Sequence, residues 1–396
     1  MTSSTPTRIH RGVWALAIMA FAIGVAEFIV VGVLPAIADD FGLPLARVGG
    51  LVGLYAFALA VGTPIVVLAL GRCSRKRLLI GLVAVFLAGN LMSAVANSYS
   101  LLLLGRLITA VAHGSFFAIG ATVAARLAPK GQASRAIALM FAGLTLAMVI
   151  GVPLGSLVGN SLGWRLPFYG VALLAALALI SVALWVPELP VTTVSKPKDA
   201  LGALVKLPIL AMMGITILGF GASFAAFTFI TSIMVDTTRF STSMANVLLV
   251  VFGVATLVGN LLGGRLAAQW GWPTALARLL AGLLIVLVAL AMAMSHQVAM
   301  VVVLFIWGLL AFGMSPGFQA GMLETAERWT PRAIDFASAL NISAFNLGIA
   351  LGEALGGLLV AHGRLDMTPW AGIWLVALAQ LPLAWLTFRH RQATRG

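Results

Sequence analysis

The sequence predicts an all-α membrane protein of twelve transmembrane helices, arranged as two repeats of six. Three observations support this fold class. Hydrophobic residues make up 61% of the 396 residues and charged residues only 9%, whereas a soluble domain carries about 25% charged residues. The apolar residues fall into runs long enough to cross a ~30 Å hydrocarbon layer. The second half of the chain also repeats a pattern of the first half.

The apolar runs place the helices in chain order, because a helix needs about 20 mostly apolar residues to cross the bilayer. Between Glu188 and Leu207, proline, threonine and lysine interrupt the apolar pattern, which predicts a cytoplasmic linker with a short amphipathic helix. We therefore expect an N-terminal six-helix bundle over 1–187, the linker over 188–207 and a C-terminal six-helix bundle over 208–396. The expected spans are 12–37, 46–70, 78–96, 100–126, 135–159, 166–187, 208–235, 244–269, 276–295, 298–323, 334–361 and 369–388.

An internal repeat relates the two halves with a displacement of 197 residues. The tripeptide Arg-Ala-Ile occurs at 135–137 and at 332–334, and each copy is followed by three glycines at four-residue spacing. Such spacing lets helices approach closely in lipid, and a proline among the glycines favours a kink. Parallel repeats of six helices are typical of transporters whose site lies between the halves. The residues predicted to pack helices, or to kink one of them for function, are Gly151, Pro153, Gly155, Gly348 and Gly352.

The basic residues predict the orientation of the chain. Of the 24 lysines and arginines, 19 fall on the side of the two termini, Arg106 falls within a span, and only Arg47, Arg165, Arg239 and Arg364 fall opposite. The positive-inside rule then predicts that both termini are cytoplasmic. The membrane that we expect is the bacterial inner membrane. This clustering explains the formal charge of +13 without a nucleic-acid partner. The oligomeric state is left open.

Glu27 is the residue that most strongly suggests a function. It lies roughly 24 Å along the helix from Arg11 and roughly 18 Å from Asp39, near the middle of the first span. An ionised carboxylate there costs several kcal/mol unless it is paired or faces a watery cavity. Two hypotheses follow: Glu27 carries a proton across the membrane, or it is a structural residue with a permanent partner.

Three further ionisable residues lie within spans. Arg106 and His113 are seven residues apart and share one helix face, with His113 at the depth of Glu27. Each either takes part in proton coupling or has a structural role, as an interhelical pair for Arg106 and as a satisfied core residue for His113. Glu353 shares a helix face with Asn346. It provides either a second proton or cation site or a buried structural hydrogen bond.

Four segments carry a resemblance to a known family: AEFIVVGVLPAIADDFG, GRLITAVAHGSFFAIGA, GVPLGSLVGNSLGWRLPF and NISAFNLGIALG. With them the whole chain resembles the major facilitator superfamily, and within it the twelve-span drug:proton antiporters of the arabinose-efflux-like group. The resemblance implies two six-helix bundles around a central cavity, alternating access, and an acidic residue of the first helix as proton carrier. It assigns that role to Glu27, the tuning of the acidic site to Arg106, and substrate contact to the region of Asn346.

The loop after the second span departs from the family pattern. Where the family typically has Gly-x-Leu-Ala-Asp-Arg-x-Gly-Arg-Lys, this chain reads VLALGRCSRK, with Gly71 in place of the aspartate. The basic residues of the expected gating loop are kept, and they are Arg72, Arg75 and Lys76. Because the carboxylate that locks one conformation in the family is missing, the gating contacts are left open.

Rings and amides could line a cavity between the halves, or could be core or lipid-facing residues. The candidates for substrate contact are Phe116, Phe117, Phe224, Phe227, Trp307, Gln319, Asn341 and Asn346. Resembling proteins handle sugars, purine nucleosides or chloramphenicol-like drugs, so the resemblance leaves the small-molecule substrate open.

The sequence predicts a proton-coupled transporter that exports a small organic molecule. Uptake by proton symport is the alternative, and a membrane sensor or enzyme is the remote one. The chain has neither a phosphate-binding loop with Lys-Ser/Thr nor an HExxH motif, and it has one cysteine, Cys73. We therefore expect no enzyme activity, no metal and no cofactor, with the proton gradient as the energy source.

Overall fold

The computed structural model of the chain describes residues 9–395 except 44, 190–196 and 231–232. Within this part eleven helices are long and apolar enough to cross a membrane, and a shorter apolar helix covers Leu54–Ala69. The helices of the first half are α1 (Arg11–Phe41), α2 (Leu45–Ala69), α3 (Arg75–Ala94), α4 (Tyr99–Leu127), α5 (Ala133–Leu146), α6 (Val152–Leu162) and α7 (Arg165–Trp185). Those of the second half are α9 (Leu207–Phe227), α11 (Thr242–Trp270), α12 (Trp272–Ala293), α13 (Gln297–Gly313), α14 (Ser315–Trp329), α15 (Ile334–Ala361) and α16 (Thr368–Arg395).

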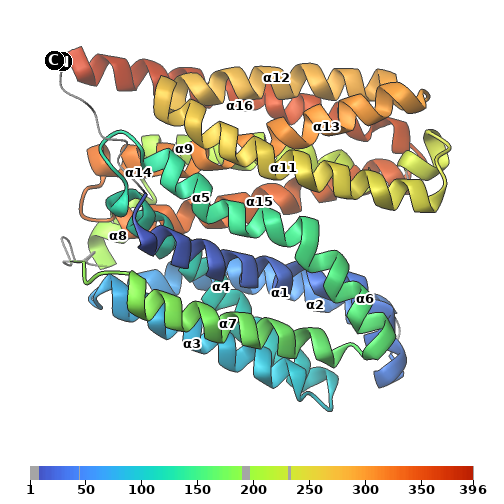
Figure 1. The fold of residues 1–396 in the computed structure, drawn as a ribbon. Helices are drawn as coiled ribbons and strands as arrows, with labels where there is room; N and C mark the ends of the chain where they lie inside the picture. The colour runs from blue at the N-terminus through green and yellow to red at the C-terminus, as the bar shows by residue number, and fades with distance from the viewer. Residues whose placement is uncertain (1–8, 44, 190–196, 231–232, 396) are drawn as a thin grey trace, which may run out of the picture.

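The helices of each half pack mainly against one another. In the first half α3 packs on α4 and α7, and α1 packs on α5 and α7; in the second half α9 packs on α15 and α16, and α11 on α13. The two halves meet where α5 contacts α11 and α14, and where α15 contacts α2 and α4 (Figure 1). This is the arrangement of two pseudo-symmetric six-helix bundles that the composition and the repeat predict.

One end of the molecule holds the start of α1, the end of α16 and the short helix α8 (Pro197–Ala203) (Figure 1). We call it the terminal end, and the other the opposite end. Helix α8 lies within the predicted linker, whose residues 190–196 are outside the described part of the chain. The boundaries of the two bundles and the cytoplasmic position of the linker remain predictions.

The helix of the fifth span is interrupted near Pro153, where the sequence predicts a kink. A π-helical turn, η1 (Ala147–Gly151), separates α5 from α6, and Pro153 is the second residue of α6. Proline has no backbone N–H to donate, and a π turn is a common way to absorb such an interruption. Gly151 and Gly155 lie against the side chains of Val25 and Ile29 on α1.

The glycines of α15 face a helix backbone rather than side chains. A Cβ atom at Gly348 would lie 2.7 Å from the carbonyl oxygen of Ile217 on α9, and one at Gly352 would meet the carbonyl oxygen of Gly221. Helices α9 and α15 therefore touch along their backbones, which fixes the position of the α15 face that looks toward the first half.

Candidate functional site

A cavity lies between the two halves, near the middle of the long helices. It receives side chains from α1, α4 and α5 of the first half and from α9, α11, α13, α14 and α15 of the second. Of the predicted site residues it includes Glu27, His113, Phe117, Phe224 and Asn346. The full lining is Glu27, Phe28, His113, Phe117, Phe141, Leu144, Thr145, Phe220, Phe224, Asn260, Phe312, Ser315, Ile342, Phe345, Asn346 and Ile349.

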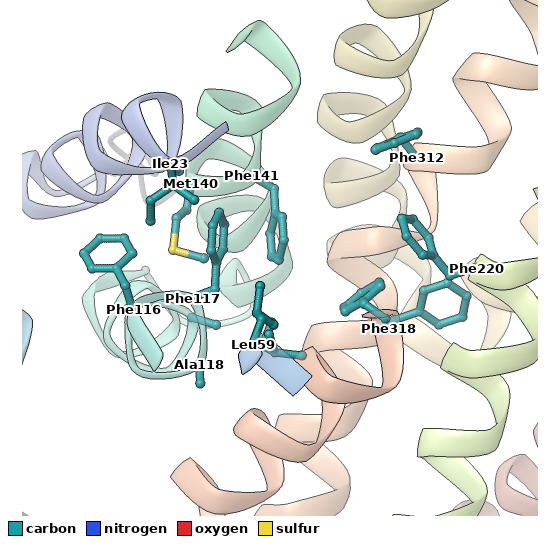
Figure 2. Close-up of a cluster of buried hydrophobic side chains, with 14 of the residues drawn as sticks. Ile23, Leu59, Phe116, Phe117, Ala118, Met140, Phe141, Phe220, Phe312 and Phe318 are labelled. Carbon is teal, nitrogen blue, oxygen red and sulfur yellow. The ribbon is translucent and has the colours of Figure 1, made fainter. Parts of the chain in front are cut away.

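Seven of the sixteen residues that line the cavity are phenylalanines, and their rings touch one another from one half to the other. The Phe117 and Phe141 ring centroids are 5.1 Å apart, Phe141 and Phe345 are 6.3 Å apart across the halves, and Phe345 and Phe220 are 4.9 Å apart. Figure 2 shows Phe117 and Phe141 on one side and Phe220 with Phe312 on the other. Rings at such distances attract each other by about 0.5–1.5 kcal/mol per pair, so the wall is cohesive and can receive another flat ring.

Glu27 projects from α1 into this cavity and is half-buried. Among the described residues no group hydrogen-bonds its carboxylate, and no cationic side chain forms an ion pair with it. Glu27 corresponds in the repeat to Phe224, which lines the same cavity from α9. The carboxylate is therefore available to a proton or to a bound molecule.

Arg106 lies behind Glu27 and is fully buried. Its Nη1 donates to the carbonyl oxygen of Ala26 at 2.5 Å, and its Nη2 donates to the carbonyl oxygen of Glu27 at 3.5 Å. Its guanidinium carbon also lies 4.0 Å from the centroid of the Tyr55 ring. Arg106 thus holds the backbone of α1 at the position of the carboxylate without forming an ion pair with it.

Tyr55 is a site residue that the sequence analysis missed. Its hydroxyl lies 2.9 Å from Nδ1 of His113 and its ring lies against the guanidinium of Arg106, so Tyr55 contacts both residues. Its repeat equivalent is the apolar Phe252. The available signal was a lone tyrosine in the second span whose counterpart in the repeat has no polar atom, the same asymmetry that singles out Glu27.

Two predicted amides lie outside the cavity, contrary to the expectation from sequence. Gln319 and Asn341 are fully buried in the second half, where Asn341 Nδ2 donates to Gln319 Oε1 at 2.8 Å. Thr216 donates to Asn341 at 2.7 Å, and Gln319 donates to Ser338 at 2.6 Å. Each amide therefore already has partners from its own bundle and offers little to a substrate.

Three predicted rings also lie outside the cavity lining. Phe116 lies beside Met140 and Ile23, away from the rings of the second half (Figure 2). Trp307 is fully buried and donates from Nε1 to Ser223, and Phe227 packs against it with centroids 6.2 Å apart. These rings support the cavity from behind.

Glu353 is exposed and does not line the cavity. It lies on the same face of α15 as Asn346 and Ile349, about one helical turn beyond Ile349 toward the opposite end. Glu353 therefore shares a helix face with Asn346, as expected. Among the described residues it makes no buried hydrogen bond, contrary to one of the two hypotheses for it.

The gating loop obtains its carboxylate from the other half. Arg75, at the start of α3, forms an ion pair with Asp335 in the first turn of α15, and both side chains are more than 90% buried. Arg75 also donates to the carbonyl oxygen of Gly71 at 3.3 Å, the position of the missing family aspartate. Arg72 is exposed and Lys76 half-buried. Asp335 was missed because the loop pattern alone cannot show which helix lies opposite it.

Side-chain hydrogen bonds join the halves in the terminal half of the helices. Asn260 donates to the carbonyl oxygen of Ala138, Ser338 to that of Ala118 and Ser343 to that of Ala60, each at 2.7 Å. With the ion pair of Arg75, they close the terminal end beneath the cavity.

Comparisons with known proteins match this architecture over nearly the whole chain. A family model described as Major Facilitator Superfamily matches residues 16–328. The chain is 39% identical over 386 residues to the uncharacterized MFS-type transporter YtbD of Bacillus subtilis (strain 168), covering 97% of each protein. It is 34% identical over 388 residues to the inner membrane transport protein YdhP of Escherichia coli (strain K12), covering 98% of each.

Solved structures show the same fold at low sequence identity. The Escherichia coli fucose:proton symporter FucP matches with a TM-score of 0.77 and 15% identity, over 94% of this chain and 98% of that one. A bacterial homologue of the iron transporter ferroportin matches with a TM-score of 0.79 and 12% identity, over 96% and 100%. The chain belongs to the Major Facilitator Superfamily, and it is a secondary transporter rather than an enzyme.

Proposed function

We propose that the chain is a proton-coupled exporter of an apolar organic molecule that carries an aromatic ring, with Glu27 as the proton carrier. One observation carries the proposal: the Glu27 carboxylate stands without a described partner in a cavity walled by rings. An ionised carboxylate in such a place costs several kcal/mol. Taking up a proton removes this cost, and so does binding a substrate that carries a hydrogen-bond donor or positive charge.

These two ways of satisfying one carboxylate exclude each other, which is the requirement for exchange. A proton on Glu27 weakens the attraction for the substrate, and a bound substrate disfavours the proton. Net transport then couples proton entry to substrate exit. Export rather than symport follows from the resemblance to the drug:proton antiporter branch, and both directions use the same site.

The cavity wall favours an aromatic drug-like molecule over a sugar. A sugar presents hydroxyl groups all around its ring, and each one loses water at a cost of about 1–3 kcal/mol unless a protein group replaces it. Seven of the sixteen lining residues are phenylalanines, which supply no such groups, and the side chains of Thr145, Asn260 and Asn346 already donate to carbonyl groups of the protein. A chloramphenicol-like molecule, whose ring can pack among Phe117, Phe141 and Phe345, suits this wall better.

The proposed location is a bacterial inner membrane with both termini in the cytoplasm. The asymmetry of the basic residues supports the orientation, and the description of YdhP as an inner membrane protein supports the membrane. On this orientation, the contacts at the terminal end close the cytoplasmic side.

The test uses proteoliposomes with an imposed pH gradient and four probes: chloramphenicol, ethidium, adenosine and L-arabinose. We expect gradient-driven transport of chloramphenicol or ethidium, and loss of that transport in Glu27→Gln, which still exchanges substrate without a gradient. Glu353→Gln is the matched control, an exposed carboxyl outside the cavity, and it should keep coupled transport. Gradient-driven transport that survives in Glu27→Gln would overturn the carrier role, and transport of L-arabinose alone would overturn the substrate class. The sign of the gradient that drives accumulation separates export from symport.

A further inference from the structure

The imidazole ring of His113 has a hydrogen-bond partner, Tyr55, and also borders the cavity, so the position of its N–H decides what it can offer to a bound molecule. It is 5% exposed and lines the cavity. Its Nδ1 lies 2.9 Å from the hydroxyl of Tyr55, and its ring is 5.2 Å from that of Phe117. Neutral imidazole carries one N–H, on Nδ1 or on Nε2, and the hydrogen bond made by one nitrogen fixes which of the two it is.

The hydroxyl of Tyr55 settles that choice. Tyr55 is 3% exposed, and in the described part of the chain its hydroxyl has one partner, Nδ1 of His113. A buried hydroxyl hydrogen needs an acceptor. If Tyr55 donates to Nδ1, this need is met and His113 holds its hydrogen on Nε2. If Nδ1 held the hydrogen instead, the hydroxyl hydrogen of Tyr55 would be left without a described acceptor.

The charges around His113 favour the neutral ring. The charged and titratable groups that face it among the described residues are Tyr55 on α2, Arg106 on its own helix, and Glu27 across the cavity. The guanidinium carbon of Arg106 lies over the face of the Tyr55 ring, 4.0 Å from its centroid, where the ring face attracts the positive charge. An imidazolium would put a second positive charge near it at a buried position.

Other polar side chains of the cavity already donate a hydrogen to a carbonyl group of the protein. Asn260 donates to Ala138, Asn346 to Ile342, and Thr145 to Ala142. In addition, Oδ1 of Asn260 is buried without a described partner, and the Glu27 carboxylate, to which no described group donates, can accept a hydrogen bond from a bound molecule. The cavity thus has groups that accept hydrogen bonds. With its hydrogen on Nε2, His113 adds a donor to this lining.

We propose that His113 is a neutral hydrogen-bond donor to the substrate, and that Tyr55 is the positioning residue that directs its Nε2–H into the cavity. The inference rests on the proposed function for its substrate. It assigns His113 a role in recognition instead of proton transfer, so that Glu27 alone carries the proton. The matching substrate has an acceptor oxygen next to an aromatic ring.

The first test reads the hydrogen on His113 directly and needs no substrate. Full-length protein labelled with ¹⁵N-histidine contains five histidines, and His113→Gln identifies the signal of His113 by its loss. We expect the neutral form with the hydrogen on Nε2 from about pH 6 to pH 8, the range in which an ordinary histidine titrates. An imidazolium at pH 7, or a hydrogen on Nδ1, would overturn the proposal.

Tyr55→Phe tests the positioning role, because it keeps the ring over Arg106 and removes only the hydroxyl. We expect the His113 signal to become a mixture of both neutral forms. A signal that stays at the Nε2–H form would show that Tyr55 does not set it. Elution as a single species in size-exclusion chromatography confirms that the variant is folded.

The second test separates recognition from proton transfer with two substitutions of His113. Glutamine can place its amide N–H near the position of Nε2 and does not titrate, whereas leucine has no donor. For chloramphenicol, whose oxygens accept hydrogen bonds, we expect KM to rise about five- to tenfold in His113→Leu, the loss of one net hydrogen bond, and clearly less in His113→Gln. The number of protons moved per substrate should stay unchanged in His113→Gln. A changed proton ratio, or equal KM values for both variants, would overturn the proposal, and the NMR result stands apart from any failure of the transport assay.

Discussion

Neutralising Asp335 should open the terminal end of the transporter. The Asp335 carboxylate is paired with Arg75 across the two halves, with side-chain exposures of 7% and 2%. Removing one partner of such a buried pair typically costs 3–5 kcal/mol, because the other charge stays buried alone. A conformation in which the halves separate at this end gives Arg75 access to water and avoids that cost. Taking about 3 kcal/mol, the ratio of open to closed molecules rises on the order of 100-fold in Asp335→Asn.

A cysteine beneath the cavity reports this opening. In a Cys73→Ser background, Ala118→Cys places a thiol at a fully buried position of α4, next to the contact with Ser338. Reaction of that thiol with N-ethylmaleimide should be at least tenfold faster in Asp335→Asn. Exchanging the charges, with Arg75→Asp and Asp335→Arg together, should return the rate toward that of the background.

The matched control is the exposed pair of Arg364 and Asp366 near the opposite end, whose side chains are 57% and 61% exposed. Asp366→Asn should leave the reaction rate unchanged, since exposed pairs contribute little. An unchanged rate in Asp335→Asn itself would refute the reasoning, because it would mean that the ion pair does not hold the halves together.

Two further predictions concern packing and the support of the carboxylate. Gly352→Ala should lower the melting temperature of the purified protein, since its Cβ meets the carbonyl oxygen of Gly221 and overpacking costs about 1–3 kcal/mol. Gly357→Ala on the same helix is the control, because its Cβ finds only the ring of Phe229 at 3.8 Å; equal melting temperatures would argue against backbone contact. Arg106→Lys should reduce gradient-driven chloramphenicol transport about tenfold, because an ammonium cannot reproduce the fork that holds two carbonyl groups of α1. If lysine serves as well as arginine, positive charge alone is what the site needs.

The fold was accessible from the sequence because lipid imposes simple rules on length and composition. A run of about 20 apolar residues must become a helix that satisfies its own backbone, and the repeat divides these helices into two halves. The π turn before Pro153 shows the limit of such rules. The proline signals an interruption, but whether the helix kinks, unwinds or gains a residue per turn depends on its packing against α1.

The sequence predicts which residues line the cavity only where the helix face and the depth in the membrane are enough to place a side chain there. Glu27 and His113 were expected at one depth, and both line the cavity. Gln319 and Asn341 show why this is insufficient, since they bond to each other on neighbouring helices of one bundle. Residue spacing gives a direction around one helix, but it does not tell which other helix stands there. Asp335 and Tyr55 were missed for the same reason.

The hydrogen bonds between the halves described above all run one way, from a side chain of the second half to a main-chain carbonyl group of the first. A carbonyl acceptor stays in place whatever side chain its residue carries, so substitutions at Ala60, Ala118 or Ala138 cannot delete it. The donors, in contrast, are each lost in a single substitution. Single side-chain substitutions that remove these three hydrogen bonds are therefore those at Asn260, Ser338 and Ser343 of the second half, whereas the first half contributes the side chain of Arg75 to the ion pair with Asp335. Because Asn260 also lines the cavity, a library that loosens the closed end without changing the cavity lining would vary only Ser338 and Ser343.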